Sequence, residues 1–505
     1  MEHLSEREQR FERGRQRFGL MLAPAVFAIL WFVPVAALSP AAHQLLAILG
    51  LVVTLWISEA IPLPVTALLG PALCVVMGIG PVKEVFRGFS DPIIFLFLGS
   101  FLLAEGMLHQ GLNRRIAFRI LAWPGVGGSS TKLLAAFGGI TALISMWVSN
   151  TATTAMMLPI GLAILSEMVR RESERLGRAV QPSEISFGTG LMLVTAFASS
   201  IGGVGTPVGS PPNLIGLGLI EKSAHVQIGF FQWMAFGVPV ALVLVVGLIL
   251  YLAWACPVAP GLMGGSAGWL ASERDRLGKW RRGELYVIGA FAITVTLWVA
   301  PGLVGLVWGR GSGAARWLSE RVPESVASLV GATLLFVVPL NFRRREFALT
   351  WNEARRIDWG TILLFGGGLA LGELMFSTGL ARWIGEGLAQ ALQTRTTFGL
   401  VVLFCAVAIV LTETTSNVAA ATMVVPVAIA VAQAAGVPPV GPAIAACLGS
   451  SMAFMLPVST PPNAIVYGSG YVPILKMVRH GLVLDLIAFV VIVAVVTWVV
   501  PLLLP

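Results

Sequence analysis

Apolar runs long enough to cross a lipid bilayer recur along the whole chain, and short polar segments separate them. A transmembrane helix needs about 20 mostly apolar residues. Continuous candidates occupy residues 19–37, 43–61, 64–80, 90–108, 229–255, 284–307, 326–341, 359–377 and 481–503. This pattern predicts an all-α integral membrane protein.

Four further apolar stretches are interrupted near their centres. Residues 131–168 are broken at 149–151, and residues 398–435 are broken at 416–418. The basic segments on both sides of the first stretch require an even number of crossings, which two full spans or a re-entrant hairpin satisfy equally well. The stretches 186–221 and 441–473 carry Gly and Pro clusters through which no regular helix runs, so each is predicted to be one broken span. With both interrupted stretches taken as hairpins, we count about eleven crossings plus two re-entrant hairpins.

The basic residues predict the orientation. Clusters at 114–119, 170–178, 274–282, 343–356 and 476–479 all fall on one side in this count, as cytoplasmic loops do. Residues 1–18 are predicted to be a cytoplasmic arm, and the C-terminus is predicted to lie outside. The exception is Arg310, Arg316 and Arg321, which fall outside.

Composition supports a membrane location and narrows the function. The chain has 505 residues, of which 56% are hydrophobic and 11% charged, whereas a soluble domain carries roughly 25% charged residues. The net charge of +8 comes from loop arginines, so nucleic acid is not an indicated partner. With neither an HExxH nor a GxxxxGK[ST] motif, nothing indicates an enzyme or an ATPase. We expect a multi-pass protein of the cell membrane that draws its energy from gradients.

The interrupted segments form a tandem repeat. Ser149 and Ser416 each precede a proline by ten residues, and the segments around Glu105 and Glu373 match upstream. Downstream, residues 210–213 (SPPN) match 460–463 (TPPN). Since 90–108 and 359–377 cross in opposite directions in the predicted topology, the copies are inverted. Inverted repeats with paired broken segments are typical of secondary transporters whose site lies near the bilayer midplane.

The residues at these breaks are Ser, Thr, Asn, Gly and Pro, without Lys, Arg, His or Asp. Their hydroxyl and amide oxygens can coordinate sodium, and their N–H groups can bind an anion. The alternative is that they only hold packed helices together, but a Pro-Pro-Asn segment inside two broken spans favours a binding site.

Four motifs resemble those of the divalent anion/sodium symporter family: SNTATTAMMLP (149–159), TETTSNVAAATMVVP (412–426), GTPVGSPPN (205–213) and SSMAFMLPVSTPPNAIV (450–466). The resemblance covers essentially the whole chain. It implies an elevator-type symporter of small dicarboxylates and related anions, coupled to Na⁺, without an organic cofactor and as a homodimer. It also implies scaffold helices in 19–130 and 284–397, with transport elements in 131–255 and 398–505.

Site residues carried over from the resemblance fall into three groups. The first sodium site would use Ser145, Ser149, Asn150 and Gly209, and the second Thr412, Thr415, Asn417 and Ser459. The anion would contact Asn150, Thr151, Ser210, Asn417, Val418, Thr460 and Pro461.

Val418 departs from the family pattern, which has threonine there. Losing one hydroxyl removes a hydrogen bond of roughly 0.5–1.5 kcal/mol, so substrate preference is expected to shift. Alternatives on the same fold are a sodium-independent dicarboxylate exchanger and a sulfate/sodium symporter. Among Glu59, Glu105, Glu373 and Glu413, local tuning or a scaffold role is favoured over proton relay, and Glu413 is the best candidate for tuning.

Overall fold

The computed structural model describes residues 6–258, 266–309, 312–392 and 396–504, and helices dominate it. The first half contains α1 (Glu6–Phe32), α2 (Pro40–Ser58), α3 (Leu63–Val76), α4 (Val82–Val85), the 3-10 helix η1 (Phe86–Ser90), α5 (Pro92–His109), α6 (Leu112–Leu121), α7 (Ser130–Ser145), α8 (Asn150–Leu176), η2 (Pro182–Glu184), α9 (Ser186–Gly203), α10 (Pro211–Ala224) and α11 (Phe230–Ala255).

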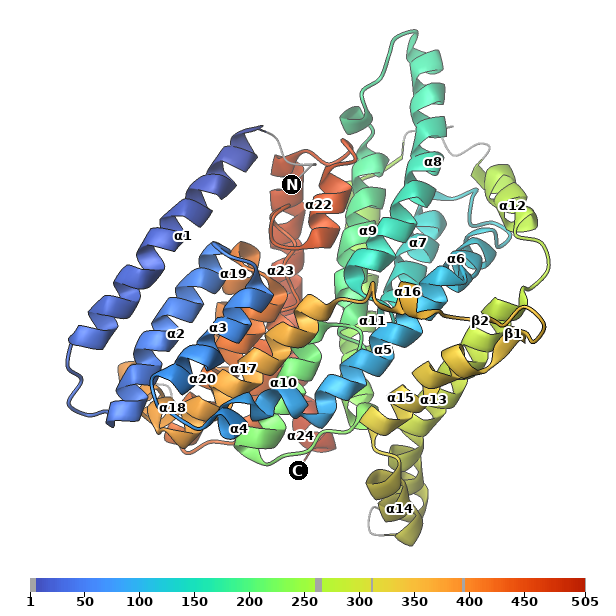
Figure 1. Ribbon diagram of the computed structural model, residues 1–505. Coiled ribbons are helices and arrows are strands. Elements are labelled where there is room, and N and C mark those ends of the chain that lie inside the picture. Colours follow the sequence, from blue (N-terminus) through green and yellow to red (C-terminus); the bar gives the residue numbers. More distant parts are fainter. Residues whose placement is uncertain (1–5, 259–265, 310–311, 393–395, 505) are drawn as a thin grey trace.

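The second half contains α12 (Ser266–Arg276), α13 (Arg282–Trp308), α14 (Gly313–Arg321), α15 (Glu324–Val337), β1 (Pro339–Asn341), β2 (Glu346–Phe347), α16 (Trp351–Ala354), α17 (Trp359–Ser377), α18 (Leu380–Leu392), α19 (Thr397–Thr414), α20 (Asn417–Ala434), α21 (Val440–Gly449), α22 (Pro461–Tyr467), α23 (Ile474–Trp498) and α24 (Val500–Leu503). Figure 1 shows that α1 begins at one face of the molecule and that α24 ends towards the opposite face.

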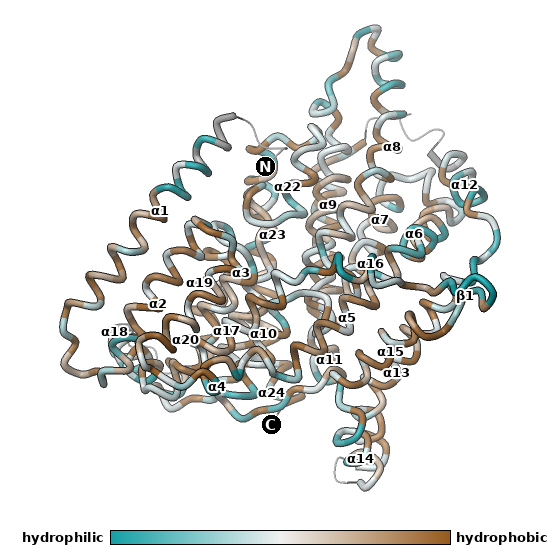
Figure 2. Tube along the Cα trace, viewed as in Figure 1, coloured by the Kyte–Doolittle hydropathy of each residue, from teal (hydrophilic) through white to brown (hydrophobic). Residues whose placement is uncertain are grey.

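A broad apolar zone separates two polar ends. In Figure 2 hydrophilic positions gather around the start of α1, the end of α8, and α12 at one end, and around α4 and α14 at the other. Within the described residues, ten helical segments are long and apolar enough to cross a membrane, and α3, α7, α15 and α21 are shorter apolar helices. The predicted class, an all-α integral membrane protein, is confirmed.

The inverted arrangement is visible in two equivalent helices. In Figure 1 α5 runs from the end of the molecule that holds α4 towards α6, whereas α17 runs from α16 towards α18, in the opposite sense. Each is followed by a glycine with positive φ, 72° at Gly111 and 85° at Gly379, and then by a shorter helix. The sequence predicts neither of these short helices, and the arginines of α6 are typical of a loop.

The arginines of α6 divide into buried and exposed ones. Arg115 is almost fully buried and pairs with Glu284 at 2.7 Å, while its other N–H groups donate to the carbonyls of Leu277, Gly278 and Lys279. Its guanidinium also lies over the Trp280 ring. This network fastens α6 to the start of α13.

The predicted arm at 1–18 is not a separate segment in its described part. Helix α1 continues from Glu6 through residue 18 into the apolar region, because no proline interrupts it before Pro24. Arg15 donates to the carbonyls of Ile57 and Thr414 and pairs with Glu59 at 3.4 Å. The arm therefore packs against the end of α2 and the tip of the second hairpin.

Several other boundaries differ from the predicted ones. Helix α8 continues to Leu176, beyond the expected end at 168, with exposed Glu–Arg pairs one turn apart along its last turns. The span expected at 326–341 ends at Val337, before Pro339 begins a two-stranded hairpin. Arg316 and Arg321 belong to α14, and Arg310 lies outside the described residues.

The connection between α8 and α9 is held by an ion pair outside the apolar zone. Arg178 and Glu184 are 2.6 Å apart, and the backbone N–H of Gln181 also donates to the Glu184 carboxylate. The hydrogen bond from Arg178, reinforced by that backbone donor, lowers the pKa of Glu184 below its ordinary value.

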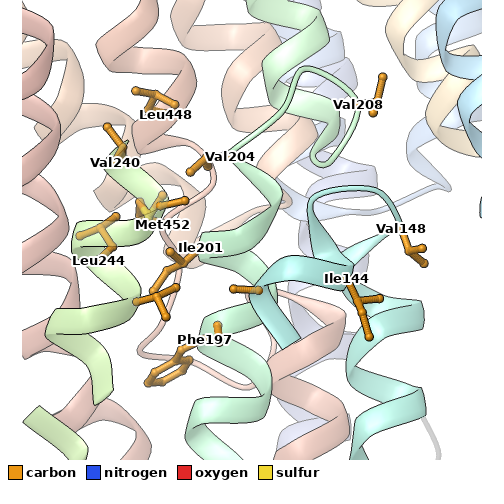
Figure 3. Packing of buried hydrophobic residues seen from close by; sticks show 14 of the residues in the cluster. Ile144, Val148, Phe197, Ile201, Val204, Val208, Val240, Leu244, Leu448 and Met452 are labelled. Carbon is orange, nitrogen blue, oxygen red and sulfur yellow. The ribbon is translucent and has the colours of Figure 1, made fainter. Parts of the chain in front are cut away.

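One large buried cluster joins both repeats. It includes Phe197 and Ile201 of α9 together with Leu448 of α21 and Met452 in the loop that follows α21. Figure 3 shows these side chains, with Val204 and Val208 of the intervening loop, around the breaks. The broken segments therefore lie in the protein interior, where non-helical backbone is tolerated at membrane depth.

Candidate functional site

Both interrupted stretches fold as helical hairpins whose tips carry the predicted motifs. Helix α7 ends at Ser145 and α8 begins at Asn150, with the Ser149 hydroxyl accepting the Ala152 N–H at 3.3 Å. In the second repeat α19 ends at Thr414 and α20 begins at Asn417, and Ser416 caps α20 in the same way at 3.2 Å. The serines of the motifs are therefore N-caps.

Both broken spans part into two helices around a loop. The first break lies between the end of α9 at Gly203 and the start of α10 at Pro211, and the second between Gly449 and Pro461. Proline is well suited to the first turn of a helix, since the N–H it lacks has no partner there. The Pro-Pro pairs thus explain where α10 and α22 restart.

The two breaks are held by the same hydrogen bonds. The side-chain amide of Asn213 donates to the carbonyls of Gly203 and Thr206, both at 2.8 Å. Asn463 donates to the carbonyls at the equivalent positions, Ala453 and Leu456, both at 3.0 Å. Since each asparagine reaches residues ten and seven positions earlier, the duplication seen in the sequence is also a duplication of loop geometry.

A group of oxygen atoms converges where the first hairpin tip meets the first break. The Ser145 hydroxyl donates to Asn150 Oδ1 at 2.8 Å. A Cβ placed on Gly209 would lie 2.6 Å from the carbonyl oxygen of Gly203, 2.8 Å from that of Met146 and 3.0 Å from that of Ser145. Similarly, a Cβ on Gly203 would lie 2.6 Å from Asn150 Oδ1. We call these oxygens of Ser145, Met146, Asn150, Gly203 and Gly209 the first oxygen cage.

The second hairpin tip makes an equivalent set of contacts. Thr412 donates to Asn417 Oδ1 at 2.8 Å, matching the Ser145–Asn150 bond, and its hydroxyl also lies 2.8 Å from the carbonyl oxygen of Ser450. Ser459 occupies the position equivalent to Gly209, and its hydroxyl lies 3.3 Å from the Asn463 amide. The oxygens of Thr412, Asn417 and Ser450 form the second oxygen cage.

The predicted site residues do not all lie at the cages. Ser145, Asn150 and Gly209 contribute to the first, and Thr412 and Asn417 to the second. Ser459 lies in the loop of the second break, where its hydroxyl donates to the Leu456 carbonyl at 2.7 Å. Thr415 is buried but contacts the Ser416 carbonyl at 3.3 Å rather than a cage oxygen. Ser149 is exposed and used as a cap.

Among the residues predicted to bind the anion, Ser210 and Thr460 are buried N-cap residues at the breaks, whereas Thr151 and Pro461 are exposed. Ser210 Oγ lies 3.2 Å from Ser451 Oγ, a contact that joins the two breaks directly. Val418 is partly buried in the first turn of α20, beside Asn417.

The sequence did not predict the contacts that fasten each hairpin tip to its break, although it singled out Glu413 for local tuning. In the first repeat Thr206 fastens the tip, because its hydroxyl donates to the Met146 carbonyl and accepts the Gly209 N–H. In the second repeat the Glu413 carboxylate accepts the N–H groups of Phe454, Met455 and Leu456 at 2.6, 2.9 and 3.2 Å. Asn213 and Asn463 could have been found from the repeated Pro-Pro-Asn; the other contacts had no signal in the sequence.

The cages consist of neutral oxygens from carbonyl, hydroxyl and amide groups. Such oxygens suit a hard monovalent cation better than a transition metal, which prefers imidazole or thiolate ligands. Within the described residues no group of three or more His, Cys, Asp or Glu side chains is placed to hold a metal.

Two solved transporter structures resemble this fold. The crystal structure of the Alcanivorax borkumensis YdaH transporter matches with a TM-score of 0.55 at 15% identity, covering 98% of this chain and 99% of that one. Neisseria gonorrhoeae MtrF, described as illuminating a class of antimetabolite efflux pumps, matches with a TM-score of 0.54 at 12% identity over 84% of this chain and 85% of its own. At these identities the likeness concerns the fold alone.

Sequence comparison gives nearer relatives. The sodium-dependent dicarboxylate transporter SdcS of Staphylococcus saprophyticus is 35% identical over 502 residues, which is 98% of this chain and 94% of that protein. SdcS of Staphylococcus aureus strain USA300 is 34% identical over 504 residues, or 99% and 94% of the two chains. The family model for the sodium:sulfate symporter transmembrane region matches residues 15–504. The chain belongs to the sodium:sulfate symporter transmembrane family, a family of transporters.

Proposed function

We propose that the protein imports a small dicarboxylate together with sodium ions. The observation that carries the proposal is the pair of oxygen cages, each built by a hairpin tip and a helix break at equivalent repeat positions. Carbonyl, hydroxyl and amide oxygens that converge in this way can replace the water ligands of a hard cation. The SdcS relatives, named as sodium-dependent dicarboxylate transporters, support the same choice of ion and substrate.

The anion site in this proposal lies between the two cages. Helices α8, α10 and α20 all begin at the hairpin tips or the first break, so their unpaired N–H groups and positive dipole ends favour negative charge there. Sodium on either side adds to this attraction. Binding of anion and cations is thereby mutually favourable, as symport requires.

Coupling to sodium also meets an energetic need. Moving a dianion inward against about 100 mV costs roughly 4.6 kcal/mol, since each charge contributes about 2.3 kcal/mol. Two sodium ions cancel the charge of the dianion, and a further one makes import electrogenic.

The proposed movement is of elevator type, in which residues 131–255 and 398–505 move as one body against a scaffold formed by 19–130 and 284–397. Direct contacts between the two repeats within that body support it: Ser210 with Ser451, Thr189 with the Tyr471 carbonyl at 2.8 Å, and Cys447 with the Pro212 carbonyl. The cytoplasmic N-terminus, the external C-terminus and the homodimer remain predictions.

Transport by the purified protein in proteoliposomes tests the proposal. Labelled succinate should accumulate when external sodium is present and should not when choline replaces it. An unchanged uptake in choline identifies a sodium-independent exchanger. A thermal-shift series with succinate, malate, fumarate, citrate, α-ketoglutarate and sulfate then ranks the anions, and a response to sulfate alone would contradict the dicarboxylate assignment.

A further inference from the structure

A small cavity with basic walls lies between α6, α12 and the turn that joins α12 to α13. In Figure 1 these two helices lie side by side. The cavity has a volume of about 300 Å³ and is lined by Arg115, Arg119, Arg274, Asp275, Leu277 and Gly278. Small-molecule sites occupy about 300–1,000 Å³, so this space is large enough for one small polar group. It shares no residue with either oxygen cage.

The wall of the cavity is fixed by Arg115. Gly278 has a φ of 60°, a conformation that turns the chain at the end of α12. The turn brings three consecutive carbonyl groups, those of Leu277, Gly278 and Lys279, onto the Arg115 guanidinium at 2.9 to 3.1 Å. Carbonyl oxygens repel an anion, but these three are occupied by the donors of a buried arginine. The turn therefore leaves the cavity favourable for negative charge.

Arg119 supplies positive charge that no protein acceptor uses. Its guanidinium carbon lies 4.6 Å from the centroid of the Trp280 ring, and that of Arg115 lies 5.0 Å from the same centroid. Among the described residues no oxygen accepts a hydrogen bond from Arg119. Arg274 contacts Asp275 through Nε and Nη2, both at 2.9 Å, which leaves its Nη1 group for another acceptor. Planar guanidinium groups of this kind match the geometry of a phosphate group.

Neighbouring charges increase the positive potential of the cavity. Arg114 and Arg276 share a single carboxylate, that of Glu273, at 3.3 and 2.5 Å. Arg115 is paired with Glu284, and Arg274 with Asp275. Around the cavity five arginines thus face three carboxylates, which leaves an excess of two positive charges. Such an excess attracts anions to the cavity.

The cavity lies at the boundary between the apolar zone and one polar end of the molecule. In Figure 2 hydrophilic positions of α6 and α12 adjoin the apolar helices. Trp123, just beyond α6, and Trp254, at the end of α11, are 69% and 79% exposed. Exposed tryptophans gather at the level of the lipid headgroups. An anion in the cavity is therefore at the depth of the lipid phosphates.

We propose that the cavity between α6 and α12 binds the phosphate group of an anionic phospholipid, with Arg119 and Arg274 as its donors. Basic pockets at the edge of a membrane domain suit such headgroups. A soluble phosphate ester offers the same charge, but the exposed tryptophans beside the cavity favour a ligand that also carries acyl chains. Because Arg115 joins α6 to α13, a lipid bound here holds the start of α13 at the membrane surface.

Binding of phosphatidylglycerol to the purified full-length protein, followed by native mass spectrometry, tests the proposal. Arg119→Gln should weaken this binding about 5-fold or more, since one basic residue near lipid phosphates contributes about that factor. Phosphatidylcholine, whose headgroup also carries a positive charge, should bind more weakly than phosphatidylglycerol. Arg343→Gln is the matched control, because it removes the same charge from an exposed arginine at the same end and outside the cavity.

A second variant reverses the sign of the effect. Asp275→Asn removes the one acidic residue that lines the cavity and releases the Arg274 guanidinium, so phosphatidylglycerol should bind more tightly. A merely structural role of these side chains would not produce opposite changes in Arg119→Gln and Asp275→Asn. Arg274→Gln provides the same comparison as Arg119→Gln if the latter does not accumulate.

Equal losses in Arg119→Gln and Arg343→Gln would overturn the inference, because the lipid would then respond to the overall charge of this end. Displacement of phosphatidylglycerol by an equal concentration of glycerol 1-phosphate would assign the cavity to a soluble phosphate ester and overturn the lipid assignment. Neither measurement involves sodium or succinate. The proposed function therefore stands or fails separately, on the sodium dependence of wild-type uptake.

Discussion

Gly209→Ala examines the first oxygen cage most directly. The backbone of Gly209 is not among the positive-φ positions, so alanine adopts its conformation without strain. The new methyl group, however, would lie 2.6, 2.8 and 3.0 Å from three carbonyl oxygens, at the centre of the proposed sodium ligands. It both occupies the space of the ion and forces the oxygens apart.

The size of the effect follows from this crowding. Overpacking a close-packed site by one methyl group typically costs about 1–3 kcal/mol. If that penalty falls on the sodium-bound state, the apparent sodium affinity decreases by about 5- to 150-fold. The equivalent residue in the second repeat is Ser459, which already carries a side chain, so only the first cage is affected.

The assay is the sodium dependence of thermal unfolding and of succinate uptake. Saturating sodium should restore uptake if the variant is folded and only its sodium affinity is reduced. Gly139→Ala is the matched control, since a Cβ there meets no atom within 4 Å on the same hairpin. Wild-type sodium affinity in Gly209→Ala, at normal expression, would show that the carbonyl cluster does not bind the ion.

Asn150→Ala and Asn417→Ala each remove a cage oxygen and an equivalent 2.8 Å hydrogen bond. In sodium titrations both variants should weaken sodium binding at least about 2-fold and to a similar degree. A large effect from only one of them would contradict the equivalence of the cages. Val418→Thr restores a hydroxyl and should change the relative affinities of small dicarboxylates by about 2- to 12-fold in competition assays, whereas unchanged ratios would remove this position from the anion site. Arg115→Met leaves its buried carboxylate partner unpaired and should destabilise the fold by about 3–5 kcal/mol in unfolding measurements, far more than the same change at an exposed arginine of α6. Because the pKa of Glu184 is lowered, its ion pair with Arg178 stabilises the α8–α9 connection above that pKa and is lost as the pH falls through it. Backbone hydrogen exchange in this connection should therefore stay slow down to about pH 4.5. Faster exchange already at a higher pH would disprove the assignment.

The sequence alone determined the features that depend on short stretches of chain. Hydropathy predicted the membrane helices because each span needs its own run of apolar residues. Proline and glycine predicted the breaks because their effects on helices are local. The hairpin tips were predicted because short polar segments interrupt two apolar stretches at matched positions. The order of these motifs also predicted the duplication. Five of the eight residues that the resemblance implies as sodium ligands contribute to the cages.

Tertiary structure decided which of these local features meet. Thr206 is 60 positions from Met146, whose carbonyl it contacts, and Glu413 is more than 40 positions from its partners in the second break. The sequence around either residue therefore does not indicate its partner. The same holds for Asp485, which stands as the one acidic residue within the apolar sequence of α23. It also holds for Arg115, whose sequence context is typical of a loop although its guanidinium is surrounded by carbonyl groups in the structure. Long-range contacts form only when the helices pack, and the sequence between two partners does not specify that they will come into contact. The sequence therefore specified a membrane carrier with two matched breaks, and the packed structure made the second break different from the first.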